Sequence, residues 1–597
     1  MAVYANSFSG AFVFDDTFHI LNNPRIVNPG MLGTILTTTR RPVIELSLAL
    51  NYAISGFEAN SYHAFNVLVH ILAALTLYGV VRRTLLLEDL RDRYGQRAPW
   101  LALAAALIWA VHPLQTQSVT YIIQRGESLM GLFYLLTLYC VIRGAGSPRC
   151  RRWYVAAVIT CTLGMGSKAV MVTAPVVILL YDRVFLAKSF GAALRQRWGL
   201  YTALAATWLV LVQVGVVGGV LSTSHPTARV GFSFKGISPL EYAMTQLGVL
   251  VYYLRLSFWP NPLCLDYDWP VVRSVGQLGP EVILIVGAAV ATAWALWRRP
   301  ALGFVGVWFF AILAPTSSFI PIHDPILEHR MYLSLAAVVV LTVLAGDGLL
   351  QNLSEKKGLR GPRRRMITVV LVGALVIALG ATTHRRNQAY RSEVVMWSDV
   401  VEQWPDNGRA RYNLANALLK AERLDEAIRQ SHEAIRIRPD HAPSHYDLGV
   451  ILEGLGKPDE AVTEYLKVLQ LDPDHANAHL NLGVLHYRRG ETELAINEYR
   501  ETLRISPAHF IAYNNLGNAL AKLGRTDEAL DAFRQVARIN PYHVQAHIKI
   551  GRILVRQNRL DEGIKAFQQA LRADPGNETA RRELEAALAR QGTMLEP

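Results

Sequence analysis

Two adjacent carboxylates, Asp15 and Asp16, lie between aromatic residues just before the first long apolar run of the chain. A carboxylate in this setting can accept the proton of a hydroxyl group while that hydroxyl attacks an electrophile, which is general base catalysis. The simpler alternative is that Asp16 caps a short helix over residues 17–21. We predict that Asp15 and Asp16 are catalytic.

Cationic side chains recur in the segments that we place on the same side of the membrane as this acidic pair. Arginine binds a phosphate through paired hydrogen bonds and lysine acts as a point charge, so both can stabilise a departing phosphate. Singly, each is explained as well by a loop residue or a snorkelling side chain. As a group they predict a site for the phosphate of a lipid-linked donor, formed by Arg125, Lys168, His329 and Arg330. We favour Arg330 because an apolar run follows it directly. The same segments carry Arg40, Arg41, Glu127 and Glu328.

The composition is that of a membrane protein with a polar appendage. The 597 residues are 51% hydrophobic and only 18% charged, which is too apolar for a soluble protein of this length. The net charge of +13 comes largely from short basic clusters between apolar runs, where the positive-inside rule places them in the cytoplasm. We therefore predict no nucleic-acid partner. The four cysteines have no CxxC spacing and predict neither a metal site nor a disulfide framework: Cys140, Cys150, Cys161 and Cys264.

Ten apolar runs predict the membrane-spanning helices, although several are short. They cover residues 64–81, 100–111, 129–142, 153–165, 169–180, 200–220, 282–297, 302–313, 333–349 and 367–379. A span over residues 242–258 would invert the sidedness of Arg298 and Arg299, so that run predicts an interfacial helix instead. Counting from the basic clusters then places Asp15, Asp16 and Lys168 outside the cytoplasm.

Some polar side chains of the apolar half are expected at membrane depth. The runs 153–165 and 169–180 are too short for two full crossings, so their turn should lie below the surface with Lys168 facing a cavity. His63, Asn66 and His70 share one helix face. We interpret these three chiefly as partners in interhelical hydrogen bonds.

The polar half repeats every 34 residues, with proline at 405, 439, 473, 507, 541 and 575. Small residues recur at the same interval where two helices of a repeat would cross. This is the tetratricopeptide pattern. It predicts a membrane domain over 1–383, a linker with an incomplete leading repeat over 384–405, five repeats over 406–575, and a capping helix with a tail over 576–597.

Polar side chains also recur at one register of the first helix in each repeat. Amide groups there can donate to and accept from a peptide backbone, although simple solvent exposure explains them equally well. We predict that the concave face binds an acceptor protein or peptide through Asn413, Asp447, Asn481, Asn515, Asn416 and Asn518. Lys549 occupies the same register in the last repeat.

The order of motifs resembles the transmembrane and tetratricopeptide repeat protein O-mannosyltransferases and their bacterial relatives. Those motifs are VFDD, NNPRIV, RRP, YHAFNVLVHIL, AVHPLQTQSVTYIIQRGESL, SKAVMVTAPVVILLYD, YYLRLSFWP and LEHRMYL, followed by the repeats. The resemblance implies an all-α polytopic membrane domain of the glycosyltransferase C type with a tetratricopeptide solenoid. It implies an inverting transfer of a sugar from a polyprenyl or dolichyl phosphate, with no metal or other cofactor, and it assigns the base to Asp15 or Asp16.

This chain departs from the family pattern at two places. Ala169 follows the lysine motif where the family usually has glutamate. The residues before Asp15 read like the exit from a span, so we expect a first span to be missing from this sequence.

We predict a membrane glycosyltransferase that moves a hexose such as mannose from a membrane lipid carrier to hydroxyl groups of extracytoplasmic proteins. The alternative is a membrane-anchored repeat scaffold for envelope proteins without catalysis. A transporter fits less well, because the span pattern shows no repeated half. The Arg-rich and Ala-rich composition and compact loops favour a bacterial inner membrane, with the catalytic loop and the repeats on the periplasmic side.

Overall fold

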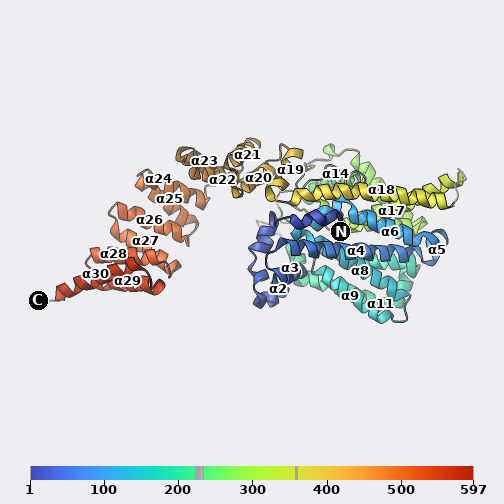
Figure 1. The fold of residues 1–597 in the computed structure, drawn as a ribbon, viewed down its shortest axis with the longest axis horizontal. Coiled ribbons are helices and arrows are strands. Elements are labelled where there is room, and N and C mark those ends of the chain that lie inside the picture. Colours follow the sequence, from blue (N-terminus) through green and yellow to red (C-terminus); the bar gives the residue numbers. More distant parts are fainter. Residues whose placement is uncertain (1, 222–229, 232–233, 235, 357–360, 596–597) are drawn as a thin grey trace. The chain divides into compact units, whose positions relative to one another are not determined.

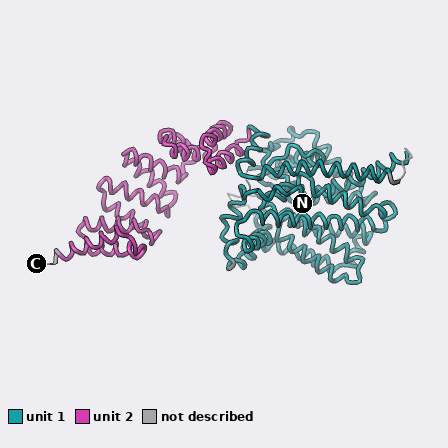
Figure 2. The backbone as a smooth tube through the Cα atoms, viewed as in Figure 1, with its two compact units in different colours: residues 1–405 teal, residues 406–597 magenta. Residues whose placement is uncertain are grey.

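The computed structural model describes residues 2–221, 230–231, 234, 236–356 and 361–595. Within these ranges the regular structure is helical (Figure 1). One isolated antiparallel bridge joins Val230 and Ile322. The chain forms two compact units, Met1–Pro405 and Asp406–Pro597 (Figure 2). The second unit begins at the residue where the repeats are predicted to begin.

The first unit is a bundle of long helices joined by short ones. Its α-helices are α1 (Pro24–Val27), α2 (Leu32–Thr38), α3 (Pro42–Ser55), α4 (Ala59–Leu85), α5 (Glu88–Tyr94), α6 (Ala98–Val111), α7 (Thr116–Thr120), α8 (Arg125–Ala145), α9 (Cys150–Met165), α10 (Ala174–Tyr181), α11 (Phe190–Ala206), α12 (Trp208–Gln213), α13 (Val216–Leu221), α14 (Pro239–Phe258), α15 (Glu281–Arg298), α16 (Pro300–Leu313), α17 (Met331–Lys356), α18 (Gly361–Asn387) and α19 (Glu393–Gln403). The tighter or wider helical turns are η1 (Ala2–Ser9), η2 (Thr17–Leu21), η3 (Pro29–Met31), η4 (Gly95–Arg97), η5 (Pro113–Gln115), η6 (Ile122–Gln124), η7 (Ala169–Thr173), η8 (Asp182–Leu186), η9 (Val275–Gln277), η10 (Glu328–Arg330) and η11 (Gln388–Tyr390). The short helix predicted after Asp16 is the π-helical turn η2.

Six helical segments in the described part of the chain are long and apolar enough to cross a membrane: Ala59–Leu85, Ile122–Ala145, Ala169–Leu186, Glu281–Arg298, Glu328–Lys356 and Arg363–Tyr390. Residues 88–111 and 113–120 form a further candidate that is bent by 56°. α16 is apolar but shorter. Eight of the ten predicted runs therefore lie in apolar helices of this kind.

The predicted span over residues 200–220 is wrong, because the structure breaks this run into α11, α12 and α13. Gly215 lies between α12 and α13 at a φ of 72°, a left-handed conformation that suits glycine and ends helices. The run 153–165 lies within α9, which is not among the candidate spans; its first turn carries Arg151 and Arg152.

α14 covers the run that is predicted to be interfacial. A reciprocal cap starts it, in which the Ser238 hydroxyl accepts from the Glu241 N–H and the Glu241 carboxylate accepts from the Ser238 N–H. The structure does not place α14 among the candidate spans of the described residues. Its polar side chains instead donate hydrogen bonds to the loop before η10: Tyr242 to Thr316 O, Gln246 to Pro325 O and Tyr253 to Leu327 O.

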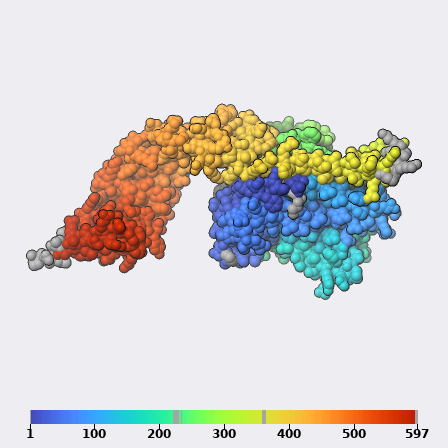
Figure 3. Space-filling model, in the orientation of Figure 1, coloured from blue at the N-terminus to red at the C-terminus, as the bar shows by residue number. Residues whose placement is uncertain are grey.

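The long helices of the first unit run side by side, with α5 at one end of the bundle and α2 and α3 at the other (Figure 1). We call the α5 end the arginine-rich end, because α4, α5, α8 and α15 finish there with Arg82, Arg83, Arg93, Arg143 and Arg298. The opposite end, which carries residues 11–16, is the acidic-loop end. α18 lies along the surface of this unit (yellow in Figure 3), and little of it is buried.

Polar residues inside the bundle pair between helices. The Asn66 amide donates to Val119 O at 3.2 Å and to Ile122 O at 3.3 Å. The His70 ring lies 2.9 Å from both the Tyr332 hydroxyl and Ala110 O. For Asn66 and His70 the structure confirms the prediction of interhelical hydrogen bonding.

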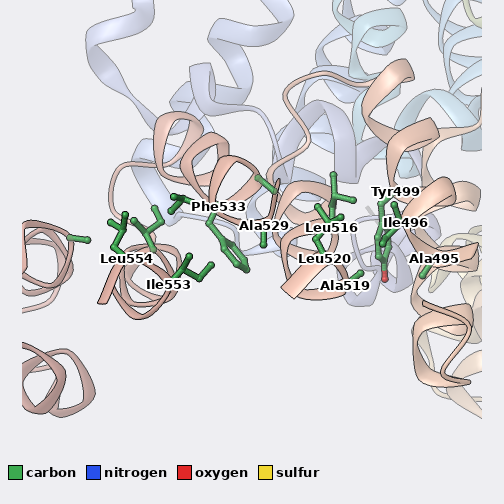
Figure 4. Packing of buried hydrophobic residues seen from close by; sticks show 14 residues of the cluster. Ala495, Ile496, Tyr499, Leu516, Ala519, Leu520, Ala529, Phe533, Ile553 and Leu554 are labelled. Carbon is green, nitrogen blue, oxygen red and sulfur yellow. The ribbon is translucent and has the colours of Figure 1, made fainter. Parts of the chain in front are cut away.

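The second unit stacks five helix pairs and a final helix. Its helices are α20 (Gly408–Lys420), α21 (Leu424–Ile437), α22 (Ala442–Gly454), α23 (Pro458–Leu471), α24 (Ala476–Arg488), α25 (Thr492–Ile505), α26 (Phe510–Lys522), α27 (Thr526–Ile539), α28 (Val544–Arg556), α29 (Leu560–Ala573) and α30 (Glu578–Leu595). Each helix contacts chiefly its immediate neighbours in the chain. Tyr499, Leu516, Phe533 and Leu554 show how α25 to α28 share one continuous core (Figure 4).

Glycine lets an aromatic ring approach the first helix of four repeats. A methyl group added at Gly449 would lie 2.6 Å from the ring of Tyr465. The same contact recurs between Gly483 and Tyr499, Gly517 and Phe533, and Gly551 and Phe567. The prediction of a small residue where two helices cross is therefore confirmed.

The glycines of α22 provide a matched pair for testing this packing. We expect Gly449→Ala to destabilise the repeats by about 1–3 kcal/mol, because the added methyl overlaps the buried Tyr465 ring. Gly454→Ala in the same helix meets open space and should be neutral or stabilising by up to ~1 kcal/mol. Hydrogen exchange of α22 and α23 in the full-length protein measures both effects, and equal protection in the two variants would contradict the assignment.

Candidate functional site

The Asp16 carboxylate fastens the acidic loop to the start of α8. It is fully buried and accepts hydrogen bonds from the Val13 N–H at 3.0 Å and the Ile123 N–H at 2.8 Å. It makes no capping bond to η2, so the helix-capping alternative is not what the structure shows. Burial raises the pKa of Asp16 to about 7, against the backbone hydrogen bonds and the charge of Arg125, which lower it.

Asp15 differs from its neighbour because its side chain is only half-buried. Its N–H donates to the Tyr121 hydroxyl at 3.1 Å. Burial lowers the pKa of both His19 and Arg41, and the charge of the Asp15 carboxylate opposes that lowering at each. Of the two predicted catalytic residues, Asp15 is the one whose carboxylate is accessible.

Phe14 fixes the loop from its other side. It has a φ of 47°, a left-handed conformation that is uncommon for a residue with a large side chain. Its N–H donates to the Glu393 carboxylate at 2.9 Å, and its ring packs edge-on against Trp397 at a centroid distance of 5.1 Å. These contacts set the direction of the backbone immediately before Asp15, so α19 helps to position the acidic pair.

Glu127 gathers two of the predicted cations. Its carboxylate forms an ion pair with Lys168, and its Oε1 lies 3.7 Å from His329 Nε2. Gln117 Oε1 lies 2.9 Å from both the backbone N and the Nδ1 of His329, and so fixes the imidazole. The structure therefore brings Lys168 and His329 together, on segments that are far apart in sequence.

Arg41 joins this cluster to the acidic loop. The Arg41 side chain is solvent-accessible. Desolvation by the surrounding protein lowers its pKa, and the charges of Glu127 and Asp15 partly oppose that lowering. It also acts electrostatically on Lys168 and His329. Asp15, Arg41, Glu127 and Lys168 thus act electrostatically on one another in sequence, and the His329 imidazole lies beside Glu127; we call these five residues the charged cluster.

Arg125 is not part of this cluster. It is fully buried between α3 and α4, where it donates to Asn51 Oδ1 at 2.7 Å, to Ser47 O at 3.2 Å and to Tyr62 O at 3.3 Å. Its guanidinium also lies 4.7 Å from the ring centre of Phe65. In this structure Arg125 joins three helices, and its charge lowers the pKa of the neighbouring Asp16.

Arg330 lies next to His329 but directs its guanidinium toward the preceding loop. It donates to Pro325 O at 2.7 Å, Asp324 O at 2.6 Å and Thr316 O at 3.1 Å. Its charge still acts on Lys168 and His329. The residue that we favoured from the sequence therefore shapes the loop beside the charged cluster.

A second buried network connects η10 with α18 and α19. Glu328 accepts from the Tyr267 hydroxyl at 2.8 Å and from the Cys264 N–H at 2.5 Å, and it lies 4.0 Å from Arg386. Arg386 also pairs with Asp399 at 2.5 Å. The Oε1 of Glu328 is therefore engaged within the protein, whereas its Oε2 is buried without a hydrogen-bond partner among the described residues. The neighbouring His329 faces the charged cluster.

In the second unit, most of the predicted acceptor-binding residues form hydrogen bonds to polar side chains of the array itself. Asn481 donates to the hydroxyls of Tyr465 at 3.1 Å and Tyr446 at 3.3 Å. Asp447 accepts from Asn416 and Tyr412. Lys549 donates to Asn518 at 2.8 Å and Asn514 at 3.0 Å, while Asn515 pairs with Asn514 at 3.4 Å. Asn413 is half-buried on α20 at the same register.

Sequence reasoning listed Arg41 and Glu127 among the charged loop residues without assigning them to the site. It also missed Gln117 and Tyr121. The RRP and QRGES motifs carried the signal for Arg41 and Glu127, but only the packing of α8 against α3 and η7 shows which member of each motif faces the charged cluster. Gln117 and Tyr121 carried no comparable signal, because uncharged polar residues are common between membrane helices.

The fold and the site define a class: a helical membrane protein with buried ion pairs at one end, joined to a tetratricopeptide array. The family model described as dolichyl-phosphate-mannose-protein mannosyltransferase matches residues 39–215, which include Arg41, Glu127 and Lys168. The family model described as tetratricopeptide repeat matches residues 396–442, 446–510, 492–544 and 514–578.

Several curated proteins align with both parts of the chain. Protein O-mannosyl-transferase F38B6.6 of Caenorhabditis elegans is 24% identical over 438 residues, which is 70% of this chain and 58% of that protein. Protein O-mannosyl-transferase TMTC4 of Mus musculus is 25% identical and covers 70% of this chain and 62% of that one. Protein O-mannosyl-transferase TMTC1 of Homo sapiens is 25% identical, with coverages of 73% and 54%. The chain therefore spans less than two thirds of the length of these relatives.

Among solved structures, the crystal structure of MamA aligns with a TM-score of 0.26 and 24% identity, covering 27% of this chain and 95% of that chain. The matches to the family models and the curated proteins agree with the motif order. The chain is similar to these protein O-mannosyl-transferases over about 70% of its length.

The raised pKa of Asp16 predicts a specific pH dependence of stability. The folded protein binds this proton with a pKa of about 7, whereas an unperturbed aspartate has a pKa of 3.8. Between these values the folded state holds more protons than the unfolded state, so stability falls as the pH rises from about 4 to about 7. We expect Asp16→Asn to flatten that part of the profile of thermal midpoint against pH, and Asp15→Asn to retain it. An unchanged slope in Asp16→Asn would contradict this assignment.

Proposed function

We propose that this chain is a membrane glycosyltransferase that moves a hexose from a polyprenyl-phosphate donor to a hydroxyl group of an acceptor protein. One observation carries the proposal: an accessible carboxylate, Asp15, is connected through Arg41 to the buried group of Glu127, Lys168 and His329. This transfer requires a general base for the acceptor hydroxyl and, next to it, a cationic site for the donor phosphate. The relation to protein O-mannosyl-transferases supports mannose as the sugar.

Asp15 is the general base in this proposal. The acceptor oxygen attacks the anomeric carbon of the donor while Asp15 takes the hydroxyl proton. The bond between that carbon and the phosphate oxygen breaks, and the electron pair leaves with the phosphate. A single displacement of this kind inverts the anomeric configuration.

Arg41 and Lys168 stabilise the departing phosphate. Arg41 supplies a planar, doubly donating guanidinium at an accessible position, and Lys168 supplies a point charge. Glu127 holds Lys168 in place before the donor arrives, so the phosphate enters a site whose cations are already oriented. His329, fixed by Gln117, lies beside the same carboxylate oxygen of Glu127 that pairs with Lys168.

Asp16 and Arg125 position the loop without touching substrate. Both are fully buried, and both oxygens of Asp16 accept backbone N–H groups. Of the two aspartates to which the resemblance assigns the base, the proposal thus selects Asp15.

The repeats present the acceptor protein in this proposal. Side chains that already pair across neighbouring helices form a stiff polar surface, and a peptide backbone can bind the remaining donors and acceptors of these amides. The positive-inside rule supports an orientation with the acidic-loop end and the repeats outside the cytoplasm.

Asp15→Asn is the direct test of the base. A positioned general base contributes roughly 10²–10⁴-fold to a rate, so we expect transfer to fall by that factor with an unchanged thermal midpoint. Asp16→Asn, its matched neighbour, should instead lower the midpoint, because one of two buried N–H groups loses its acceptor at a cost of about 1–3 kcal/mol. Intact-mass analysis of an acceptor protein incubated with membranes and lipid-linked hexose measures transfer. Transfer that survives unchanged in Asp15→Asn would contradict the assignment of Asp15 as the base.

The two substrates should respond to different variants. We expect Lys168→Gln and Arg41→Gln to raise the KM for the lipid-linked donor roughly tenfold or more, because each removes a charged contact worth about 1.5–3 kcal/mol. Arg40→Gln removes the same charge one residue away and serves as the control. Asn413→Ala should raise the KM for the acceptor alone. Identical effects of Arg40→Gln and Arg41→Gln would count against the proposed phosphate site.

A further inference from the structure

An apolar cavity of about 750 Å³ opens at the arginine-rich end of the first unit. Helices α4, α5, α8, α10, α16 and α17 enclose it, and its walls are leucine, valine, alanine and aromatic side chains such as Leu77, Leu138, Phe304 and Trp308. Its volume lies within the roughly 300–1,000 Å³ that is usual for ligand pockets.

The cavity is distinct from the charged cluster. Glu127 starts the same α8 helix that contributes Leu138 to the wall. At about 1.5 Å per residue, Leu138 lies roughly 16 Å further along the helix axis than Glu127. None of the residues of the charged cluster lines the cavity.

The polar groups of the cavity are confined to two places. In the wall, the hydroxyls of Thr84 and Tyr181 bond to each other at 2.7 Å. At the mouth lie Asp89, Arg93 and Arg299. Asp89 forms an ion pair with Lys188, so the two arginines leave the mouth with a net positive charge.

We propose that this cavity binds an anionic membrane phospholipid, with its acyl chains between the helices and its headgroup phosphate between Arg93 and Arg299. The wall residues Leu302 and Leu341 remain 42% and 43% exposed, which is expected of a cavity that opens toward lipid. A soluble ligand would have to bury its polar groups against hydrocarbon without partners, at a cost that acyl chains do not incur. Basic pockets between helices at the cytoplasmic surface favour anionic headgroups. The site goes beyond the proposed transfer reaction and does not depend on it.

The test uses the full-length protein reconstituted in nanodiscs that contain dioleoylphosphatidylcholine mixed with dioleoylphosphatidylglycerol. Lipids that stay bound after exchange into detergent are identified by mass spectrometry. We expect retained phosphatidylglycerol with the wild type, and retention that is weaker by roughly tenfold or more in Arg93→Gln/Arg299→Gln. Arg91→Gln/Arg298→Gln removes the same number of charges from the same end without touching the cavity, and should retain the lipid.

A third variant separates the cavity from its mouth. Ala337→Phe places a ring in the cavity wall and should expel both lipids, whereas the arginine variant should lose only the preference for phosphatidylglycerol. Equal losses in the two arginine pairs, equal retention of phosphatidylcholine and phosphatidylglycerol by the wild type, or no retained lipid would each overturn the proposal. So would preferential retention of an added polyprenyl phosphate, which would make the cavity part of the donor site. No outcome depends on whether the protein transfers sugar.

Discussion

A charge that leaves water must find a partner inside the protein, and the first unit is arranged around this constraint. Asp16 meets it with two backbone N–H groups, one from its own loop and one from the turn before α8. That single carboxylate therefore fixes where the N-terminal loop lies on the bundle. Arg125 meets the same requirement with carbonyl and amide oxygens from α3 and α4. The buried and hydrogen-bonded side chains of Asp16 and Arg125 therefore support the loop that carries Asp15.

The other ionisable side chains inside the first unit form two groups, one that joins elements of the fold and one that borders the candidate site. Glu328, Arg386 and Asp399 bind one another and join η10 to α18 and α19. Glu127, Lys168 and His329 also bind one another, but the accessible Arg41 lies beside them. The first group joins elements of the fold, whereas a group that borders an accessible cation can respond to a ligand. This contrast, more than the number of charges, separates framework from site.

Much of the architecture followed from local sequence patterns, and much of the site did not. The interval of 34 residues fixed the repeats because every unit meets the same packing requirement, as Gly449 and Tyr465 illustrate. The length of the apolar runs identified most spans but failed at residues 200–220. Gly215 adopts a left-handed conformation there, which the hydrophobicity of the sequence does not reveal. The acidic pair was conspicuous in the sequence. The different environments of its two members were not, since Val13, Ile123 and Tyr121 supply the contacts. The sequence does not distinguish Arg125 from Arg41. The structure shows that Arg125 is buried among helices and that Arg41 is solvent-accessible.

The neighbour-to-neighbour packing of the second unit makes its length adjustable. Each helix contacts chiefly the helices next to it in the chain, and the same glycine-to-ring contact recurs along the array. A tandem duplication of 34 residues would therefore create interfaces of a kind that the protein already contains. α30 would still cover the last apolar face. The number of repeats can thus set the length of the partner segment that the array binds, while the membrane bundle stays unchanged.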